Sequence, residues 1–243
     1  MVIIIENWWN FYDLCYNVFV MIPNRKTRRI TVKFHNLSIE CDYLENFESS
    51  NLLILLPPSP IYGGSKNESV FNYMFSKLYN SNCSLVRFNF LNTIDEINKD
   101  TDFISRFSMQ ASLVIESIKN QIRVCQDNLC EISIVGLSTG AMVGLNLLMR
   151  RIDIKYLFMV SPTVTEVNLS EIKSFEDINN NVRIYYGTKD SVISSDKYTS
   201  LVKKIKASDR SFEGANHLFI NHEEALFNQI FSVLNSGPFD GIN

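Results

Sequence analysis

The strongest constraint on the fold is a short run of aliphatic residues at 51–56 (NLLILL). Alternate side chains of a strand point to opposite faces, so five consecutive large apolar residues leave neither face suited to water. Such a strand is typical of a parallel sheet that is covered by helices on both sides. The rest of the chain therefore has to supply two helical layers.

The remaining sequence alternates between strand and helix patterns, as such a sheet requires. Further strands are predicted at 84–90, 131–135, 155–160, 182–186 and 210–213. Helices are predicted at 70–79, 104–124, 139–150, 197–205 and 223–234. Ahead of these, residues 30–43 alternate apolar and polar side chains around a turn near Asn36, which predicts an antiparallel pair. We therefore expect an α/β fold, with a mostly parallel central sheet, antiparallel first strands and helices on both faces.

Length and composition fit one large α/β domain. The chain has 243 residues, of which 46% are hydrophobic and 20% are charged, and this is enough apolar material for a sizeable core. The formal net charge of -3 argues against a protein whose main task is binding nucleic acid. Because the 5 cysteines are odd in number and scattered, no disulfide framework is predicted, and we expect a cytoplasmic protein.

No sequence motif for a metal or a cofactor is found. The phosphate-binding patterns GxxxxGK[ST] and GxGxxG are missing from the chain. Cys125 and Cys130 do not have zinc-ribbon spacing, and the 3 histidines do not cluster. We therefore expect neither a metal nor a cofactor.

Residues 1–28 are predicted to form an aromatic helical extension of a domain that covers residues 29–243. Apolar residues recur at helical spacing at Trp8, Phe11, Cys15, Val18 and Ile22. Glu6 and Asp13 interrupt the stretch and no basic residue precedes it, which argues against an export signal or a membrane span. We expect this helix to pack on the domain or on a partner chain.

Two other interpretations of the extension stay open. The basic cluster at 25–29 would help the helix to contact a membrane surface, although the same cluster is explained more simply by a solvated strand edge. Alternatively, Met21 could itself begin a complete domain.

The chemistry centres on residues 136–140 (GLSTG), a GxSxG pentapeptide. An apolar strand pattern (EISIV) leads into it and a helix pattern (AMVGLNLLMR) follows. A tight turn from strand to helix raises the central serine above the carboxyl edge of the sheet, where open α/β sheets place their ligands. Ser138 is therefore the candidate nucleophile; the alternative is an ordinary serine at a helix N-terminus.

A serine hydroxyl becomes a good nucleophile only when a histidine takes its proton and a carboxylate orients that histidine. Asp190 and His217 each follow a predicted strand, so the chain order is serine, acid, histidine. The rival base is His222, which is expected to be a solvated residue at the start of a helix. The rival acids are Asp196 and Asp209, neither of which directly follows a buried strand.

An oxyanion hole needs two N–H donors that point at the developing negative charge. The first is the backbone N–H of Thr139, the residue after the nucleophile. The second is expected from the loop at 57–65 (PPSPIYGGS), in which the prolines have no N–H to donate. Ser59 is the earliest residue of this loop that can donate, and Ile61 is the second choice.

Two further segments narrow the family. Residues 55–64 (LLPPSPIYGG) and 85–90 (LVRFNF) resemble a group of small bacterial serine hydrolases in the α/β-hydrolase superfamily, related to dienelactone hydrolases and to its peptidase-like branch. In that group the corresponding segments read roughly HPHPLYGG and LRFNF. The resemblance runs from about residue 30 through nearly the whole chain. It implies the α/β-hydrolase fold and a serine hydrolase with Ser138, Asp190 and His217 as its triad.

The sequence departs from the group in two places. Pro57 and Ser59 stand where the group has histidines, and residues 91–96 (LNTIDE) replace a glycine-rich stretch. Both segments are expected to border the active site, so the substrate preference of the group cannot be carried over to this chain.

Only residues 161–180 separate the strand after the nucleophile helix from the next strand, where many α/β-hydrolases insert a cap domain. This length leaves room for one short helix, so no large cap is expected. Part of the cover over the active site is expected to come instead from the N-terminal helix or from a second subunit of a homodimer.

The sequence thus predicts a serine hydrolase that acts on a small-molecule acyl substrate through an acyl-enzyme on Ser138. A carboxylic ester is the expected substrate because its leaving group needs the least assistance, although thioesters and amides use the same groups. The alternatives are a non-catalytic binding protein that has the same fold and an acyl transferase.

Overall fold

The computed structural model describes residues 25–46, 51–79, 83–91, 103–121, 131–150, 154–164 and 181–235. Residues 1–24, which hold most of the predicted N-terminal helix, lie outside them. So do most of the residues predicted to replace the glycine-rich stretch and most of the segment predicted to replace a cap.

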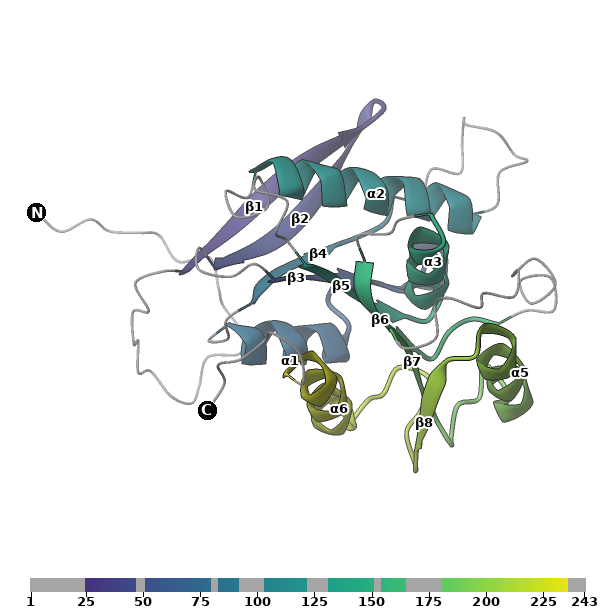
Figure 1. The fold of residues 1–243 in the computed structure, drawn as a ribbon. Helices are drawn as coiled ribbons and strands as arrows, with labels where there is room; N and C mark the ends of the chain where they lie inside the picture. Colours follow the sequence, from purple (N-terminus) through teal and green to yellow (C-terminus); the bar gives the residue numbers. More distant parts are fainter. Residues whose placement is uncertain are drawn as a thin grey trace, which may run out of the picture.

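The described strands form one eight-stranded sheet in the order β1-β2-β4-β3-β5-β6-β7-β8 (Figure 1). Their bounds are β1 Arg25–Phe34, β2 Leu37–Asn46, β3 Asn51–Leu56, β4 Ser84–Phe88, β5 Glu131–Leu137, β6 Ile154–Val160, β7 Val182–Gly187 and β8 Ser208–Phe212. The pairs β1–β2 and β2–β4 are antiparallel, whereas every other pair is parallel. This arrangement confirms the predicted mostly parallel sheet with antiparallel first strands.

Helices cover both faces of the sheet, as predicted (Figure 1). Their bounds are α1 Ser69–Leu78, α2 Phe103–Gln121, α3 Thr139–Leu148, α5 Ser195–Ile205 and α6 Glu223–Asn235. Buried side chains of α2, α3 and α5 belong to one apolar cluster, and those of α1 and α6 belong to another. The sheet lies between these two clusters, because a right-handed crossover places its helix on one face or the other according to the direction in which the chain moves across the sheet.

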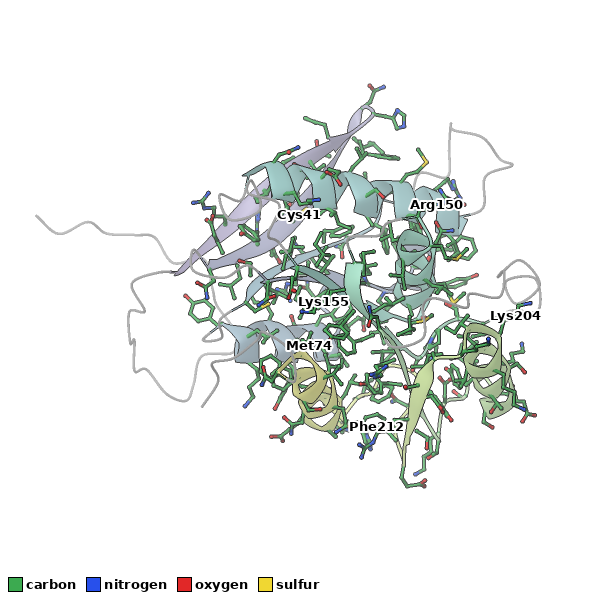
Figure 2. The ribbon with its side chains drawn as sticks, viewed as in Figure 1. Cys41, Met74, Arg150, Lys155, Lys204 and Phe212 are labelled. Carbon is green, nitrogen blue, oxygen red and sulfur yellow. The ribbon has the colours of Figure 1, made fainter. Side chains whose placement is uncertain are left out.

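The central strand β3 shows why both layers are needed. Leu52, Ile54 and Leu56 pack in the cluster with α2 and α3, whereas Leu53 and Leu55 pack in the cluster with α1 and α6. All five side chains are at most 1% exposed. Figure 2 labels a member of each cluster, Cys41 on β2 and Met74 on α1. The apolar run at 51–56 is therefore buried on both faces, as its sequence predicts.

The first two strands form the expected hairpin, with its turn at His35 and Asn36. The strand begins earlier than predicted: β1 already starts at Arg25, so residues 25–28 belong to the sheet rather than to a helical extension. Pairing along β2 explains this, because Arg25 lies opposite Asn46 and the Arg28 guanidinium forms an ion pair with Glu45 at 2.7 Å.

Smaller differences concern the ends of elements. Strand β4 ends at Phe88, two residues earlier than predicted, whereas α5 and β8 each begin two residues earlier. The predicted end of α2 at 124 lies outside the described residues. The predicted loop at 57–65 contains one short 3-10 turn, Pro60–Tyr62. Strand β8 has few apolar residues, and it pairs as a mostly exposed edge strand, where polar side chains are favoured.

The described residues contain neither a candidate membrane-spanning helix nor a candidate metal-binding cluster. None of the helices that the structure describes is both long and apolar enough to cross a membrane. Within the same part of the chain, no three His, Cys, Asp or Glu side chains gather in a way that could hold a metal ion.

Candidate active site

Ser138 lies in the turn between β5 and α3, with φ 57° and ψ −117°. A positive φ is strained for a residue with a side chain, so neighbouring contacts have to hold the turn. The Ser138 N–H donates to the Val160 carbonyl at 2.8 Å, and the Ser138 carbonyl accepts from the Ala141 N–H at 3.1 Å. These bonds fix the serine between two strand ends, where its side chain is directed into the site.

The two glycines of the pentapeptide are needed because the chain passes very close to itself. A Cβ atom on Gly136 would lie 2.4 Å from the Gly140 carbonyl oxygen. A Cβ atom on Gly140 would lie 2.1 Å from the Leu56 carbonyl oxygen at the end of β3. This turn at residues 136–140, the nucleophile elbow, therefore packs directly on the start of the loop that was predicted to supply an oxyanion donor.

The structure brings Ser138, His217 and Asp190 together. His217 Nε2 lies 2.9 Å from Ser138 Oγ, and His217 Nδ1 lies 2.8 Å from Asp190 Oδ2. An ionised carboxylate can only accept, so Nδ1 carries the proton and Nε2 is free to accept from the serine hydroxyl. The three side chains form one continuous hydrogen-bonded chain from a carboxylate to a hydroxyl.

The loops that carry Asp190 and His217 are joined through their backbones. The Lys189 N–H donates to the Ala215 carbonyl at 2.9 Å, and the Gly214 N–H donates to the Thr188 hydroxyl at 2.9 Å. A Cβ atom on Gly187 would lie 2.0 Å from the Ala215 carbonyl oxygen, so only glycine allows the loops to approach this closely. The distance between the acid and the histidine is therefore set by backbone contacts.

Asp190 is surrounded by donors. Its Oδ1 accepts from the N–H groups of Val192 at 2.8 Å and Ile193 at 3.0 Å, and its Oδ2 accepts from the Tyr198 hydroxyl at 2.5 Å. Burial by itself would raise the pKa of Asp190. The hydrogen bonds from His217, Tyr198 and Ile193 outweigh burial and hold this pKa below its ordinary value. Asp190 is therefore ionised at neutral pH.

Sequence reasoning did not identify Tyr198 as part of this network. Its ring lies on α5 and is 0% exposed, so in the sequence it is indistinguishable from the other apolar residues of an amphipathic helix. Only its spacing of eight residues after Asp190 connects the two, and no local motif uses that spacing.

The rival residues have other partners. The ring of His222 is half-buried rather than solvated, and its Nε2 lies 3.2 Å from the Glu213 carbonyl oxygen. Asp209 accepts from the Tyr186 hydroxyl at 3.1 Å, and Asp196 lies in the first turn of α5. Among the described residues, His217 is the candidate base that hydrogen-bonds to Ser138. Asp190 is the candidate acid that hydrogen-bonds to His217.

The two predicted oxyanion donors, Thr139 and Ser59, line the same cavity as Ser138. Thr139 is the first residue of α3, and the N–H groups of the first helical turn have no partner within the helix. Ser59 is buried, and its N–H makes none of the loop hydrogen bonds among the described residues. The N–H of Ile61, the second choice, instead donates to Ser59 Oγ at 3.3 Å.

These groups share one cavity of about 630 Å³. Its walls come from the β3–α1 loop, the elbow and the two loops that carry the acid and the histidine, and they include Ser59, Thr139, Val192 and Leu218. Ser138 and His217 also line it. A volume of this size accommodates a small organic molecule, so the hydrogen-bonded chain ends where a ligand can bind.

The known proteins described below share at most 25% sequence identity with this chain. No protein-family model matches the chain. An uncharacterized protein of Rickettsia prowazekii is 25% identical over 175 residues, which are 69% of this chain and 71% of that protein.

Three solved structures show the likeness in three dimensions. A protein of unknown function from Agrobacterium tumefaciens, described as an α/β hydrolase, superposes with a TM-score of 0.70 at 22% identity, over 89% of this chain and 100% of that one. A lidless α/β serine hydrolase from Xanthomonas campestris gives 0.69 at 15% identity, over 87% and 94%. A dienelactone hydrolase from Anabaena variabilis gives 0.67 at 13% identity, over 88% and 98%. The chain therefore has the α/β-hydrolase fold, and the resemblance read from the sequence is confirmed at the level of the fold.

Proposed function

We propose that this protein is a serine hydrolase that cleaves a carboxylic ester through an acyl-enzyme on Ser138. The observation that carries the proposal is the chain of hydrogen bonds from Asp190 through His217 to Ser138, which ends inside the cavity. An imidazole that is oriented by a carboxylate and lies beside a hydroxyl is the arrangement that activates a serine nucleophile.

In the first half of the reaction, Ser138 Oγ attacks the carbonyl carbon of the ester while its proton moves to His217 Nε2. The negative charge on the carbonyl oxygen is held by the N–H groups of Thr139 and Ser59. The bond to the alcohol oxygen then breaks, and His217 gives its proton to the leaving alkoxide. Asp190 remains ionised throughout and stabilises the imidazolium.

In the second half, water takes the place of the alcohol. His217 removes a proton from the water as its oxygen attacks the acyl carbon, and the second tetrahedral intermediate uses the same two N–H donors. Collapse of this intermediate releases the carboxylic acid, and His217 returns a proton to Ser138 Oγ. The enzyme is restored with no group consumed except water.

An ester is the proposed substrate because an alcohol is a better leaving group than an amine, so the single imidazole can supply enough assistance. Thioesters and amides would follow the same steps. An acyl transferase would differ only in the second half, where an alcohol or a thiol would replace water as the acceptor.

A fluorophosphonate probe tests the nucleophile directly. Activated serines displace fluoride from such probes and become covalently labelled, so we expect labelling of the intact protein and none of Ser138→Ala. Labelling of neither protein would favour a non-catalytic binding protein. Analysis of the products from p-nitrophenyl butyrate, with and without added alcohols, then distinguishes a hydrolase from an acyl transferase.

A further inference from the structure

The cavity around Ser138 is almost free of charge. Among the described residues that line it, Glu68 is the only one with an acidic or basic side chain besides His217. Much of the remaining surface is apolar and includes Pro58, Tyr62, Val192 and Leu218. An apolar wall favours apolar acyl chains, so the single charge becomes the main electrostatic feature that a substrate meets.

The charge of Glu68 is not neutralised by a cation among the described residues. Its Oε1 accepts from the Ser65 N–H at 3.0 Å, in the loop before α1, and this neutral donor does not cancel the charge. The neighbouring Lys66 is directed elsewhere, since its ammonium group pairs with Asp42 at 3.0 Å. A ligand in the cavity therefore meets a net negative field on this side.

On the basis of the proposed function, we propose that the site selects esters with uncharged acyl groups and discriminates against acyl groups that carry a second carboxylate, with Glu68 as the residue that sets this preference. Two like charges in a partly desolvated cavity repel each other more strongly than they would in water. An uncharged chain meets no such cost and gains from the apolar wall.

The test compares two esters with the same leaving group and acyl length: p-nitrophenyl butyrate and mono-p-nitrophenyl succinate. The native protein is expected to hydrolyse the butyrate ester with the higher kcat/KM. Glu68→Gln is expected to raise the ratio of kcat/KM for the succinate ester to kcat/KM for the butyrate ester by about tenfold, as removal of a nearby charge repulsion should. Glu40→Gln, at an exposed position on β2, changes the net charge equally and is expected to leave the ratio unchanged.

The outcomes separate this proposal from the one on which it rests. Equal hydrolysis of both esters by the native protein, or an unchanged ratio in Glu68→Gln, overturns the selection by charge while the hydrolase stands. A protein that hydrolyses neither ester and resists the fluorophosphonate probe overturns the proposed function and, with it, this inference.

A second inference comes from the helix that follows the acid loop. Tyr198 lies on α5, and its hydroxyl donates to Asp190 Oδ2, the same oxygen that His217 Nδ1 contacts. The ring is fully buried and stacks on the ring of Tyr186, with 4.7 Å between the ring centroids. The hydroxyl of Tyr186 is bound to Asp209, outside the proposed catalytic chain. Two stacked tyrosines thus hold two different carboxylates.

We infer that Tyr198 is a positioning residue for the proposed reaction. By donating to Oδ2, it holds the carboxylate in the rotamer that meets His217, and it withdraws part of the negative charge that this oxygen presents to the imidazole. The hydrogen bond also favours the ionised form of Asp190, in agreement with its lowered pKa. Because Tyr198 is not among the residues that line the cavity, it acts through Asp190.

Tyr198→Phe removes the hydroxyl and keeps the ring, and Tyr186→Phe is the matched control. In Tyr198→Phe we expect kcat/KM for p-nitrophenyl butyrate to fall by about tenfold, on the scale of one hydrogen bond to a charged group. We also expect the acidic limb of its pH profile to move to higher pH, because a carboxylate with one donor fewer stabilises the protonated imidazole more strongly. Tyr186→Phe should leave both unchanged.

The pH profile distinguishes positioning from a loss of packing, since a general loosening of α5 lowers the rate without moving the limb. Measurements are made at a temperature at which both variants retain the native near-ultraviolet circular dichroism. An unmoved acidic limb in Tyr198→Phe, or equal effects in the two variants, overturns the assignment.

Discussion

Asp42 and Asp190 are two carboxylates held by several donors each, but the donors differ in kind. Asp42, on β2, accepts from the Arg87 guanidinium at 3.1 Å and from the Lys66 ammonium at 3.0 Å. Arg87 also donates to Asn72 Oδ1 at 2.6 Å and stacks over the Phe75 ring at 4.4 Å. Permanent cations thus cancel the charge of Asp42, and this network can only stabilise the fold.

In the described part of the chain, Asp190 has no lysine or arginine among its partners. It is held by two backbone N–H groups, a tyrosine hydroxyl and an imidazole, and its side chain is 1% exposed. Its charge is therefore available for an imidazolium that forms only during reaction. The N–H of Ser59, a residue that lines the cavity, likewise makes none of the loop hydrogen bonds among the described residues. A network in which cations pair with the carboxylate supports the fold. A network that runs from a carboxylate to a titratable group in a cavity can support chemistry.

Asp190→Asn is expected to have the largest effect on this contrast. The amide cannot stabilise the imidazolium and favours the wrong tautomer of His217, so kcat for p-nitrophenyl butyrate should fall by about 10⁴-fold. The folded structure should persist, as measured by circular dichroism and the thermal midpoint. If more than about one tenth of the rate remains, the proposed role of Asp190 is wrong.

Ser59→Pro tests the backbone N–H of Ser59, the second proposed oxyanion donor. Ser59 has φ −62°, which proline also adopts, so the substitution removes the N–H with little backbone strain. The loss of one oxyanion donor should lower kcat by about 10²- to 10³-fold. Ser59→Ala is the control, because it loses only the hydroxyl that accepts from Ile61 and should keep most of the rate. Equal losses in the two variants would assign the effect to the cap instead.

Asp42→Asn tests the ion-pair network of Asp42, and it is expected to lower the free energy of unfolding. Arg87, with a side chain that is 6% exposed, would lose its anionic partner, and breaking a buried ion pair costs about 3 kcal/mol in the free energy of unfolding. The activity of the folded protein should remain. Urea unfolding of this variant and of Asp209→Asn, an exposed-network control, measures the difference. A loss of activity in folded Asp42→Asn would show that the two regions are coupled.

The smallest expected effect is the pH dependence of stability that Asp190 contributes. Since the pKa of Asp190 is lower in the folded state, its contribution is fully present above the ordinary value of 3.8 and is lost as the pH falls below it toward the folded value. The difference in unfolding free energy between the native protein and Asp190→Asn should therefore shrink as the pH falls below 3.8. A difference that grows as the pH falls would contradict the lowered pKa.

Local patterns were sufficient for much of the fold and of the candidate site. The aliphatic run of β3, the GxSxG turn and the placement of Asp190 and His217 after strands all depend on residues close together in the chain. The ends of elements were less well predicted. The start of β1 at Arg25 depends on pairing with Asn46, and the polar strand β8 exists because β7 offers an open edge.

The amino-acid sequence by itself determined the alternation of strands and helices, the elbow and the order of serine, acid and histidine, because hydrophobic periodicity and turn chemistry are properties of neighbouring residues. Only the tertiary structure decided that Tyr198 shares the oxygen of Asp190, that Glu68 faces the cavity and that His222 turns toward the Glu213 carbonyl. These contacts join segments that the crossover connections place at one edge of the sheet, and no local pattern records which side chains will meet there.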